Sequence, residues 1–114
     1  MELIIDLKDR PNDVKLVVLR GEIGTDTVNK LKESLDSQVD SGTKNLIINF
    51  QDVNYLNSMG LGVIAATLKK VRKEKGDLKL IKLSPAVQEL FELTRLTKIF
   101  KIFTTEEEAL NDFA

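Results

Sequence analysis

One segment of the sequence, residues 52–62 (DVNYLNSMGLG), gathers the residue types that could do chemistry. Ser58 follows Asn57 and precedes two glycines, Gly60 and Gly62. A serine at the N-terminus of a helix can carry a phosphate, because free backbone N–H groups and the helix dipole stabilise the added negative charge. The simpler interpretation is an N-cap, in which Asn57 or Ser58 accepts a hydrogen bond from a free N–H, and the pattern alone favours it. One residue can serve both purposes.

The segment does not fit the familiar catalytic motifs. A nucleophile elbow has glycine two residues before the serine, where this chain has Leu56, and the sequence contains no histidine to act as base. Gly60 and Gly62 lack the third glycine of a dinucleotide fingerprint and the Gly-Lys-Ser/Thr of a P-loop. The sequence also has no cysteine, which removes disulfides and the usual zinc sites. We therefore expect a protein that is not an enzyme and holds no cofactor or metal.

Length and composition indicate one globular domain over residues 1–114, with 42% hydrophobic and 31% charged residues. The formal net charge is -1, so no strong field attracts nucleic acid or an anionic membrane. No apolar stretch suits a bilayer span, and the N-terminus lacks the basic and long apolar regions of a secretory signal. These features predict a cytoplasmic protein that binds neither nucleic acid nor membrane.

Apolar runs predict the strands that must position residues 52–62. They are expected at residues 3–5, 14–19, 46–50, 78–83 and 99–103. Turn-forming residues between the first two predict an antiparallel hairpin. The nearly continuous apolar run at residues 46–50 is typical of a central strand, and residues 51–57 after it are interpreted as a loop.

Apolar residues at helical spacing predict four helices. The expected helices are residues 28–39 with Thr25 or Asp26 as N-cap and Gly42 just beyond, a second from Ser58 to near Gly76, a third from Ser84-Pro85 to near Thr94, and a short last one capped by Thr104 or Thr105 with Ala109, Leu110 and Phe113 inward. Strands that alternate with helices imply parallel crossovers. The predicted fold class is therefore α/β (α+β), a mixed β-sheet of four to five strands with helices packed mainly on one face.

Two loops should meet at one end of this sheet, because both follow strands that end there. We expect them to form a partner-binding surface from Gly24, Thr25, Asp26, Asn57, Ser58, Met59, Gly60, Leu61 and Gly62.

Three motifs in this order resemble the STAS domain, in particular the single-domain bacterial anti-sigma factor antagonists. They are LRGEI at residues 19–23, the segment 52–62 after its strand, and LSPAV at residues 83–87 followed by Leu90-Phe91. The resemblance implies a non-enzymatic partner switch. In such a switch the unphosphorylated protein binds an anti-sigma factor that is also an ATP-dependent serine kinase, and so frees a sigma factor. Ser58 stands at the family's acceptor position, so the resemblance also implies phosphorylation of Ser58 and a phosphatase that removes the phosphate.

Three positions depart from the family pattern. Asn57 and Met59 stand where the family usually has Asp before the acceptor and Ser, Thr or Ala after it, and Gly24 stands where it commonly has Asp. Two alternatives remain open. The first is a STAS scaffold or interaction module in a signalling or transport assembly that works without phosphorylation. The second is a small enzyme or nucleotide-binding module built on Ser58, Gly60 and Gly62.

Overall fold

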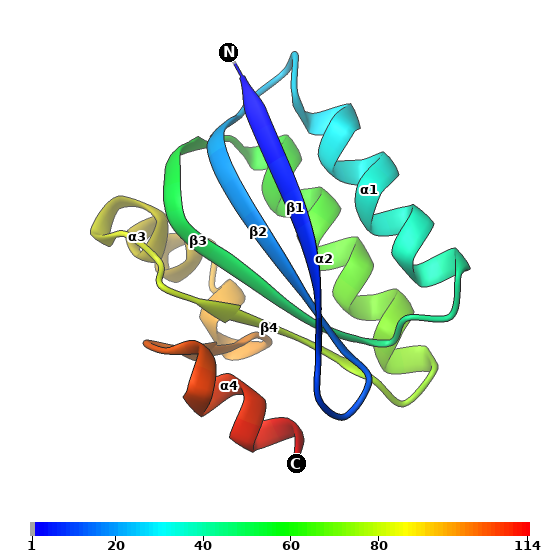
Figure 1. Ribbon diagram of the computed structural model, residues 1–114. Coiled ribbons are helices and arrows are strands. Elements are labelled where there is room, and N and C mark those ends of the chain that lie inside the picture. The colour runs from blue at the N-terminus through cyan, green and yellow to red at the C-terminus, as the bar shows by residue number, and fades with distance from the viewer. Residues whose placement is uncertain (1) are drawn as a thin grey trace.

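The fold is a five-stranded mixed sheet in the order β1-β2-β3-β4-β5, seen in a computed structural model that describes residues 2–114 (Figure 1). The strands are β1 (Leu3–Arg10), β2 (Val14–Ile23), β3 (Asn45–Leu56), β4 (Asp77–Ile81) and β5 (Lys101–Phe103). β1 and β2 form the antiparallel hairpin, and β2 to β5 pair in parallel. The predicted α/β class and strand number are confirmed.

Helices cover the sheet unequally. They are α1 (Val28–Asp40), α2 (Ser58–Lys73), α3 (Pro85–Leu93) and α4 (Glu106–Phe113), with a short 3-10 helix η1 (Leu96–Lys98) between α3 and β5. In Figure 1, α1 and α2 lie side by side behind the sheet and α4 lies in front of it. The side chains of α1, α2 and α3 share one apolar core with the sheet, whereas α4 packs on a smaller, separate cluster. The helices therefore pack mainly on one face, as predicted.

The larger core is closed at one edge by three aromatic rings. Phe91 of α3 meets Phe50 of β3 edge to face at 6.3 Å between ring centroids, and it meets Phe100 in the same way at 5.6 Å. All three side chains are buried. Edge-to-face pairs add about 0.5–1.5 kcal/mol beyond the area they bury. This contact holds α3 against the sheet.

The central strand is longer than predicted. Residues 51–57 were expected to form a loop, but β3 continues to Leu56. Its pairing with β2 shifts register twice, and each shift places one extra residue on β3. Such bulges bend a strand and change which face its side chains occupy. Beyond Phe50 the buried residues are therefore Val53 and Leu56, three apart, instead of alternate residues.

Other boundaries also differ from the predictions. The two hairpin strands, predicted at residues 3–5 and 14–19, extend to Arg10 and Ile23. The N-cap position of α1 is Thr27, so the prediction of Thr25 or Asp26 as the N-cap was wrong. β4 ends at Ile81 because Lys82 adopts a left-handed φ of 58°. The predicted strand 99–103 shrinks to Lys101–Phe103, because η1 precedes it.

The other helix signals are confirmed. Ser84 caps α3 by accepting from the Val87 N–H at 3.3 Å. Thr105 and Glu108 form a reciprocal capping box at the start of α4. The apolar side of α4 faces the sheet through Ala109, Leu110 and Phe113, as expected.

Candidate functional site

The two predicted loops lie together at one end of the sheet. Ile23 at the end of β2 pairs with Leu56 at the end of β3. One residue further, the N–H of Asn57 donates to the carbonyl of Ile23 at 3.0 Å. Residues 24–26 and 57–62 follow directly from this junction. The structure therefore brings the two segments together, as the strand order predicted.

Asn57 caps α2. Its backbone is extended (φ -95°, ψ 176°), and its Oδ1 accepts from the N–H of Gly60 at 3.0 Å. Ser58 is the first residue of the helix and is exposed. Its hydroxyl makes no hydrogen bond to any of residues 2–114. Of the two cap candidates, the structure selects Asn57 and leaves the Ser58 hydroxyl free to react.

The first loop is held by Thr27, a residue that the sequence analysis did not single out. Its side chain is buried, and its hydroxyl accepts from the N–H of Gly24 at 2.9 Å and donates to the carbonyl of Glu22 at 2.7 Å. These bonds tie the end of β2 to the start of α1. A threonine three residues after Gly24 is a pattern that could have suggested it, since Ser and Thr commonly bond to nearby backbone groups.

The nine predicted contact residues divide into exposed and buried groups. The exposed ones are Thr25, Asp26, Ser58, Met59 and Gly62, and Asn57 is half-buried. Gly24, Gly60 and Leu61 are buried. The side chain of Leu61 faces the core and is only 4% exposed, so it supports this surface from below. The two buried glycines shape the backbone beneath the surface.

An apolar groove between α1 and α2 begins beside Ser58. Its volume is about 280 Å³, and Met59, which is 50% exposed, stands at its end nearest the two loops. The groove is lined by Lys32, Asp36, Met59, Gly62, Val63, Ala66, Thr67 and Lys70. A flexible methionine beside an apolar depression is typical of surfaces that adapt to a partner.

Charges on the rim of the groove form a small network. Asp36 of α1 accepts from Lys32 at 2.7 Å and from Lys70 of α2 at 2.9 Å. The hydrogen bond from Lys32, followed by that from Lys70, lowers the pKa of Asp36 below its ordinary value of 3.8. The same carboxylate raises the pKa of Lys32. The network favours the ionised forms of Asp36 and Lys32, and the bond from Lys70 links the two helices across the groove.

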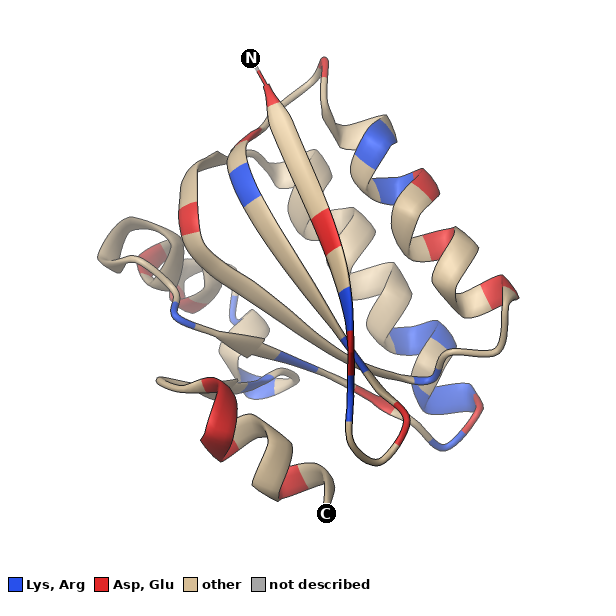
Figure 2. Cartoon of the chain, viewed as in Figure 1, with Lys and Arg blue, Asp and Glu red and all other residues tan. Residues whose placement is uncertain are grey.

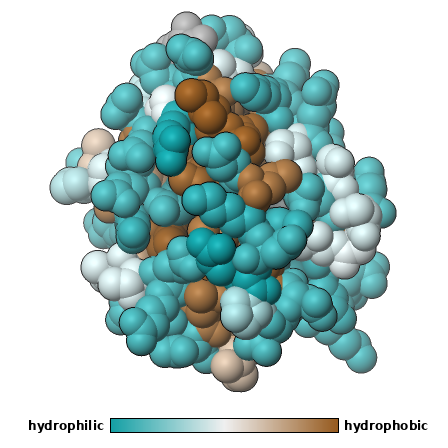
Figure 3. Space-filling model, in the orientation of Figure 1, coloured by the Kyte–Doolittle hydropathy of each residue, from teal (hydrophilic) through white to brown (hydrophobic). Residues whose placement is uncertain are grey.

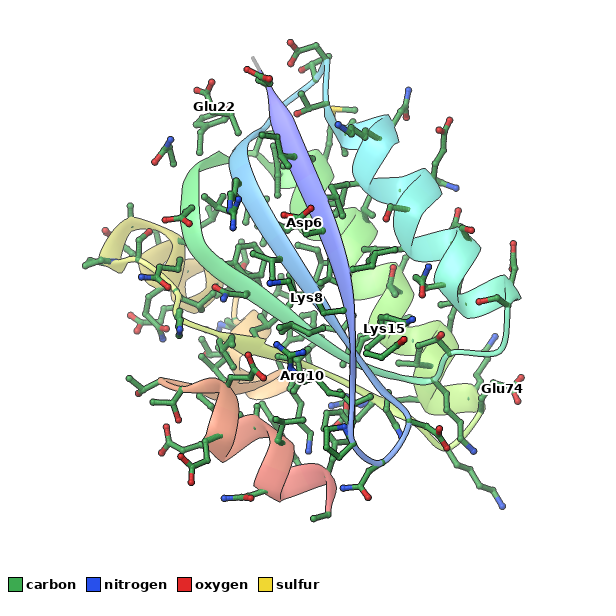
Figure 4. The ribbon with its side chains drawn as sticks, viewed as in Figure 1. Asp6, Lys8, Arg10, Lys15, Glu22 and Glu74 are labelled. Carbon is green, nitrogen blue, oxygen red and sulfur yellow. The ribbon has the colours of Figure 1, made fainter. Side chains whose placement is uncertain are left out.

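A larger hollow of about 650 Å³ lies between the C-terminal ends of α1 and α2, next to Glu74, which Figure 4 labels far from Glu22 and the two loops. Within the described chain, no three His, Cys, Asp or Glu residues are grouped to hold a metal ion. The search of the same residues found no helix with the length and apolar character needed to cross a membrane.

The family follows from comparison with known proteins. The STAS domain family model matches residues 5–109. The chain belongs to the STAS domain family. This STAS chain is 38% identical over 94 residues to the anti-sigma-B factor antagonist of Bacillus subtilis (strain 168), covering 82% of this chain and 84% of that protein. It is 37% identical over 109 residues to the anti-sigma-B factor antagonist of Listeria monocytogenes serovar 1/2a, covering 95% of each.

Solved structures support the same assignment. The crystal structure of an anti-sigma factor antagonist from Mycobacterium paratuberculosis superposes on the STAS chain with a TM-score of 0.89 at 29% identity. The superposition covers 98% of this chain and 94% of that one. The resemblance read from the three sequence motifs is confirmed.

Proposed function

We propose that this STAS protein is an anti-sigma factor antagonist. In its unphosphorylated form it binds an anti-sigma factor in the cytoplasm and thereby frees a sigma factor. The anti-sigma factor is also a serine kinase that phosphorylates Ser58 and ends the complex, and a phosphatase restores the original state. The observation that carries the proposal is the free hydroxyl of Ser58, exposed at the start of α2 beside the loop at residues 24–26. The similarity to the anti-sigma-B factor antagonists of Bacillus subtilis and Listeria monocytogenes supports it.

The position of Ser58 suits a switch that changes surface charge and leaves the fold intact. A phosphate adds a charge of about -1.5 to -2. At the first residue of a helix, that charge is favoured by the dipole and by N–H groups that lack partners within the helix. Because Asn57 already provides the cap, phosphorylation of Ser58 breaks no hydrogen bond within residues 2–114. The added charge acts instead on the docking partner, through repulsion and desolvation.

The proposed contact surface joins both loops to the groove between α1 and α2. Thr25 and Asp26 supply polar groups, and Met59 and Gly62 border the apolar groove. Gly62 leaves the helix surface open, since a methyl group there would contact no atom within 4 Å. A partner side chain can therefore approach α2 closely next to Ser58.

Capture and phosphorylation assays with Ser58 variants test the proposal. The parent protein, Ser58→Ala and Ser58→Asp are immobilised and exposed to lysate of the source organism. Captured proteins are identified by mass spectrometry and assayed for transfer of phosphate from ATP to Ser58. We expect the parent and Ser58→Ala to retain an anti-sigma factor, Ser58→Asp to retain much less, and only the parent to be phosphorylated.

Ser37→Asp, on the exposed side of α1, adds the same charge elsewhere and should bind normally. Equal binding by Ser58→Asp and the parent would contradict the charge switch.

A STAS interaction module without phosphorylation is the second candidate. Two observations favour it: Asn57, the neutral residue before Ser58, serves as the cap, and Met59 offers an apolar contact that does not depend on phosphate. Intact-mass measurement and peptide mapping of the protein from its native cells separate the two candidates. A phosphate on Ser58 supports the switch. Its absence under both growth and stress conditions supports the interaction module without phosphorylation.

A further inference from the structure

We propose that β1 is a homodimerisation edge, on which a second copy of this chain adds its own β1 antiparallel about a two-fold axis through Leu7. β1 is an edge strand of the sheet and is eight residues long. An edge strand of this length offers a row of backbone groups to another strand. Figure 1 shows β1 at the margin of the sheet, with β2 as its one neighbouring strand.

The backbone of β1 has a defined free window. The N–H of Glu22 donates to the carbonyl of Glu2, which fixes the even-numbered residues of β1 as those bonded to β2. The odd-numbered residues therefore point their N–H and C=O groups outward. Lys30 of α1 already bonds to the carbonyl of Leu3 at 2.5 Å, and Arg10 bonds to that of Asp9 at 3.1 Å. Between these two occupied carbonyls, the backbone N–H and C=O groups of Ile5 and Leu7 point outward.

The two-fold axis through Leu7 uses this window fully. Leu7 pairs with Leu7 of the second copy, and Ile5 pairs with Asp9 of the second copy, each as a hydrogen-bonded pair. The carbonyl of Asp9 keeps a second lone pair for this bond, since a backbone oxygen accepts two. The side chain of Leu7 is 41% exposed, and two such side chains cover each other at the axis.

Charge selects this register over its neighbours. Asp6 stands directly opposite Lys8 of the second copy, and Lys8 opposite Asp6, in the pairs whose side chains lie closest. An axis one residue away in either direction would place Asp6 against Asp6 or Lys8 against Lys8. Figure 2 shows the acidic and basic residues alternating along β1, and Figure 4 labels Asp6, Lys8 and Arg10 in succession on it. The strand is therefore complementary to itself at one register.

Lys8 has a particular role in the proposal. It is exposed and forms no ion pair with the other residues among 2–114. A lone lysine on an edge strand normally keeps other strands away. Here Asp6 lies two residues before Lys8, so the antiparallel strand of a second copy places its Asp6 carboxylate opposite the Lys8 ammonium. Ile4 is 46% exposed on the same face, where Figure 3 shows apolar side chains in brown among polar ones.

Charge exchange tests the register. Sedimentation velocity across a concentration series that reaches about 1 mM should show a reversible dimer for the parent chain. Asp6→Lys places Lys opposite Lys8 twice and should weaken the dimer roughly tenfold or more. The double variant Asp6→Lys, Lys8→Asp should restore it. Asp6 also lies 3.8 Å from Arg20, but both variants lose that contact, so the restoration reports the pairing between copies. Asp40→Lys, at the exposed end of α1, changes the net charge equally and should leave the dimer unchanged.

A single cysteine gives a second, independent readout, because the chain contains none. Leu7→Cys should form a disulfide-linked dimer, since opposed residues of a hydrogen-bonded pair have Cα atoms about 5.5 Å apart. Leu93→Cys, at a position 74% exposed on α3, should not. A chain that stays monomeric throughout the series, or a dimer that Asp6→Lys leaves intact, overturns the proposal. Neither result depends on Ser58, so the outcome is separate from that of the proposed function.

Discussion

Gly60 of α2 packs directly against Ile23 of β2: a methyl group at position 60 would come within 2.6 Å of the Ile23 Cγ2 atom. It would come equally close to Leu56. Ile23 is fully buried, so the core has to shift to admit the methyl. Gly60→Ala should therefore lower the free energy of unfolding by about 1–3 kcal/mol. Urea denaturation followed by circular dichroism measures this change.

Gly62 provides the matched control, two residues along the same helix. A methyl group there meets nothing within 4 Å, and the position is exposed. Because alanine favours helix over glycine, Gly62→Ala should raise the free energy of unfolding by roughly 0.5–1 kcal/mol. The close packing of Gly60 is refuted if both substitutions stabilise the protein alike.

Asn57 and Ser58 should differ sharply in their contribution to stability. Asn57→Ala removes the side-chain bond to the Gly60 N–H and should cost about 1 kcal/mol. Ser58→Ala removes a hydroxyl without a hydrogen bond to residues 2–114 and should change stability by less than about 0.5 kcal/mol. Thermal and urea unfolding of both variants check this. A larger loss for Ser58→Ala would show that Ser58 is the true cap.

Thr27 should be sensitive to the loss of its hydroxyl. Thr27→Val keeps the shape of the side chain but leaves the Gly24 N–H and the Glu22 carbonyl without this partner. Leaving such buried groups unsatisfied should cost about 1–3 kcal/mol in the free energy of unfolding. Thr27→Ser retains the hydroxyl and should lose less. Amide hydrogen exchange at Gly24 offers a local readout, and unchanged protection in Thr27→Val would contradict the bonding described.

The attachment of α4 should depend on pH. Lys79, buried in β4, donates to Asp112 of α4 at 2.5 Å and lies 3.7 Å from the centre of the Phe113 ring. The hydrogen bond from Lys79, assisted by one from Lys101, lowers the pKa of Asp112 below its ordinary value of 3.8. Near pH 4 the unfolded chain therefore binds more protons at this carboxyl than the folded chain does. The resulting stabilisation is complete above about pH 5 and is lost as pH falls through the lowered pKa.

The measurement is the free energy of unfolding between neutral and acidic pH. Asp112→Asn should destabilise the protein at pH 7, because the buried ammonium of Lys79 loses its ionic partner, and should flatten the acid limb of the curve. Asp40→Asn, at the exposed end of α1, controls for the loss of one carboxylate. Lys79→Met should be better tolerated than Asp112→Asn, since an apolar replacement removes the buried charge together with its need for a partner. Parallel curves for Asp112→Asn and the parent would refute the linkage.

The parts of the fold that follow simple periodicity were predictable from the sequence. Three local signals each predicted the correct element. They are the helical spacing of Leu31 and Leu35, the Ser84-Pro85 helix start and the apolar run at residues 46–50. The meeting of the two loops was also predictable, because parallel strands end at one edge of a sheet.

The remainder depends on contacts between distant residues. The extension of β3 past Phe50 comes with two bulges against β2, which remove the alternation that identifies a strand. The choice of Asn57 over Ser58 as cap depends on backbone geometry at the end of β3. The role of Thr27 depends on the path of the chain after Glu22. The burial of Leu61 agrees with the helical apolar period that it shares with Ile64, Leu68 and Val71.

The free hydroxyl of Ser58 has a consequence for how the proposed cycle is sustained over time. The hydroxyl bonds to no other residue among 2–114. Phosphorylation of Ser58 would therefore break no internal hydrogen bond, and removal of the phosphate would re-form none. Each round therefore begins and ends with the same folded chain. In the proposed cycle, the supply of unphosphorylated protein would then depend on the rates of the two opposing reactions and not on refolding of the chain.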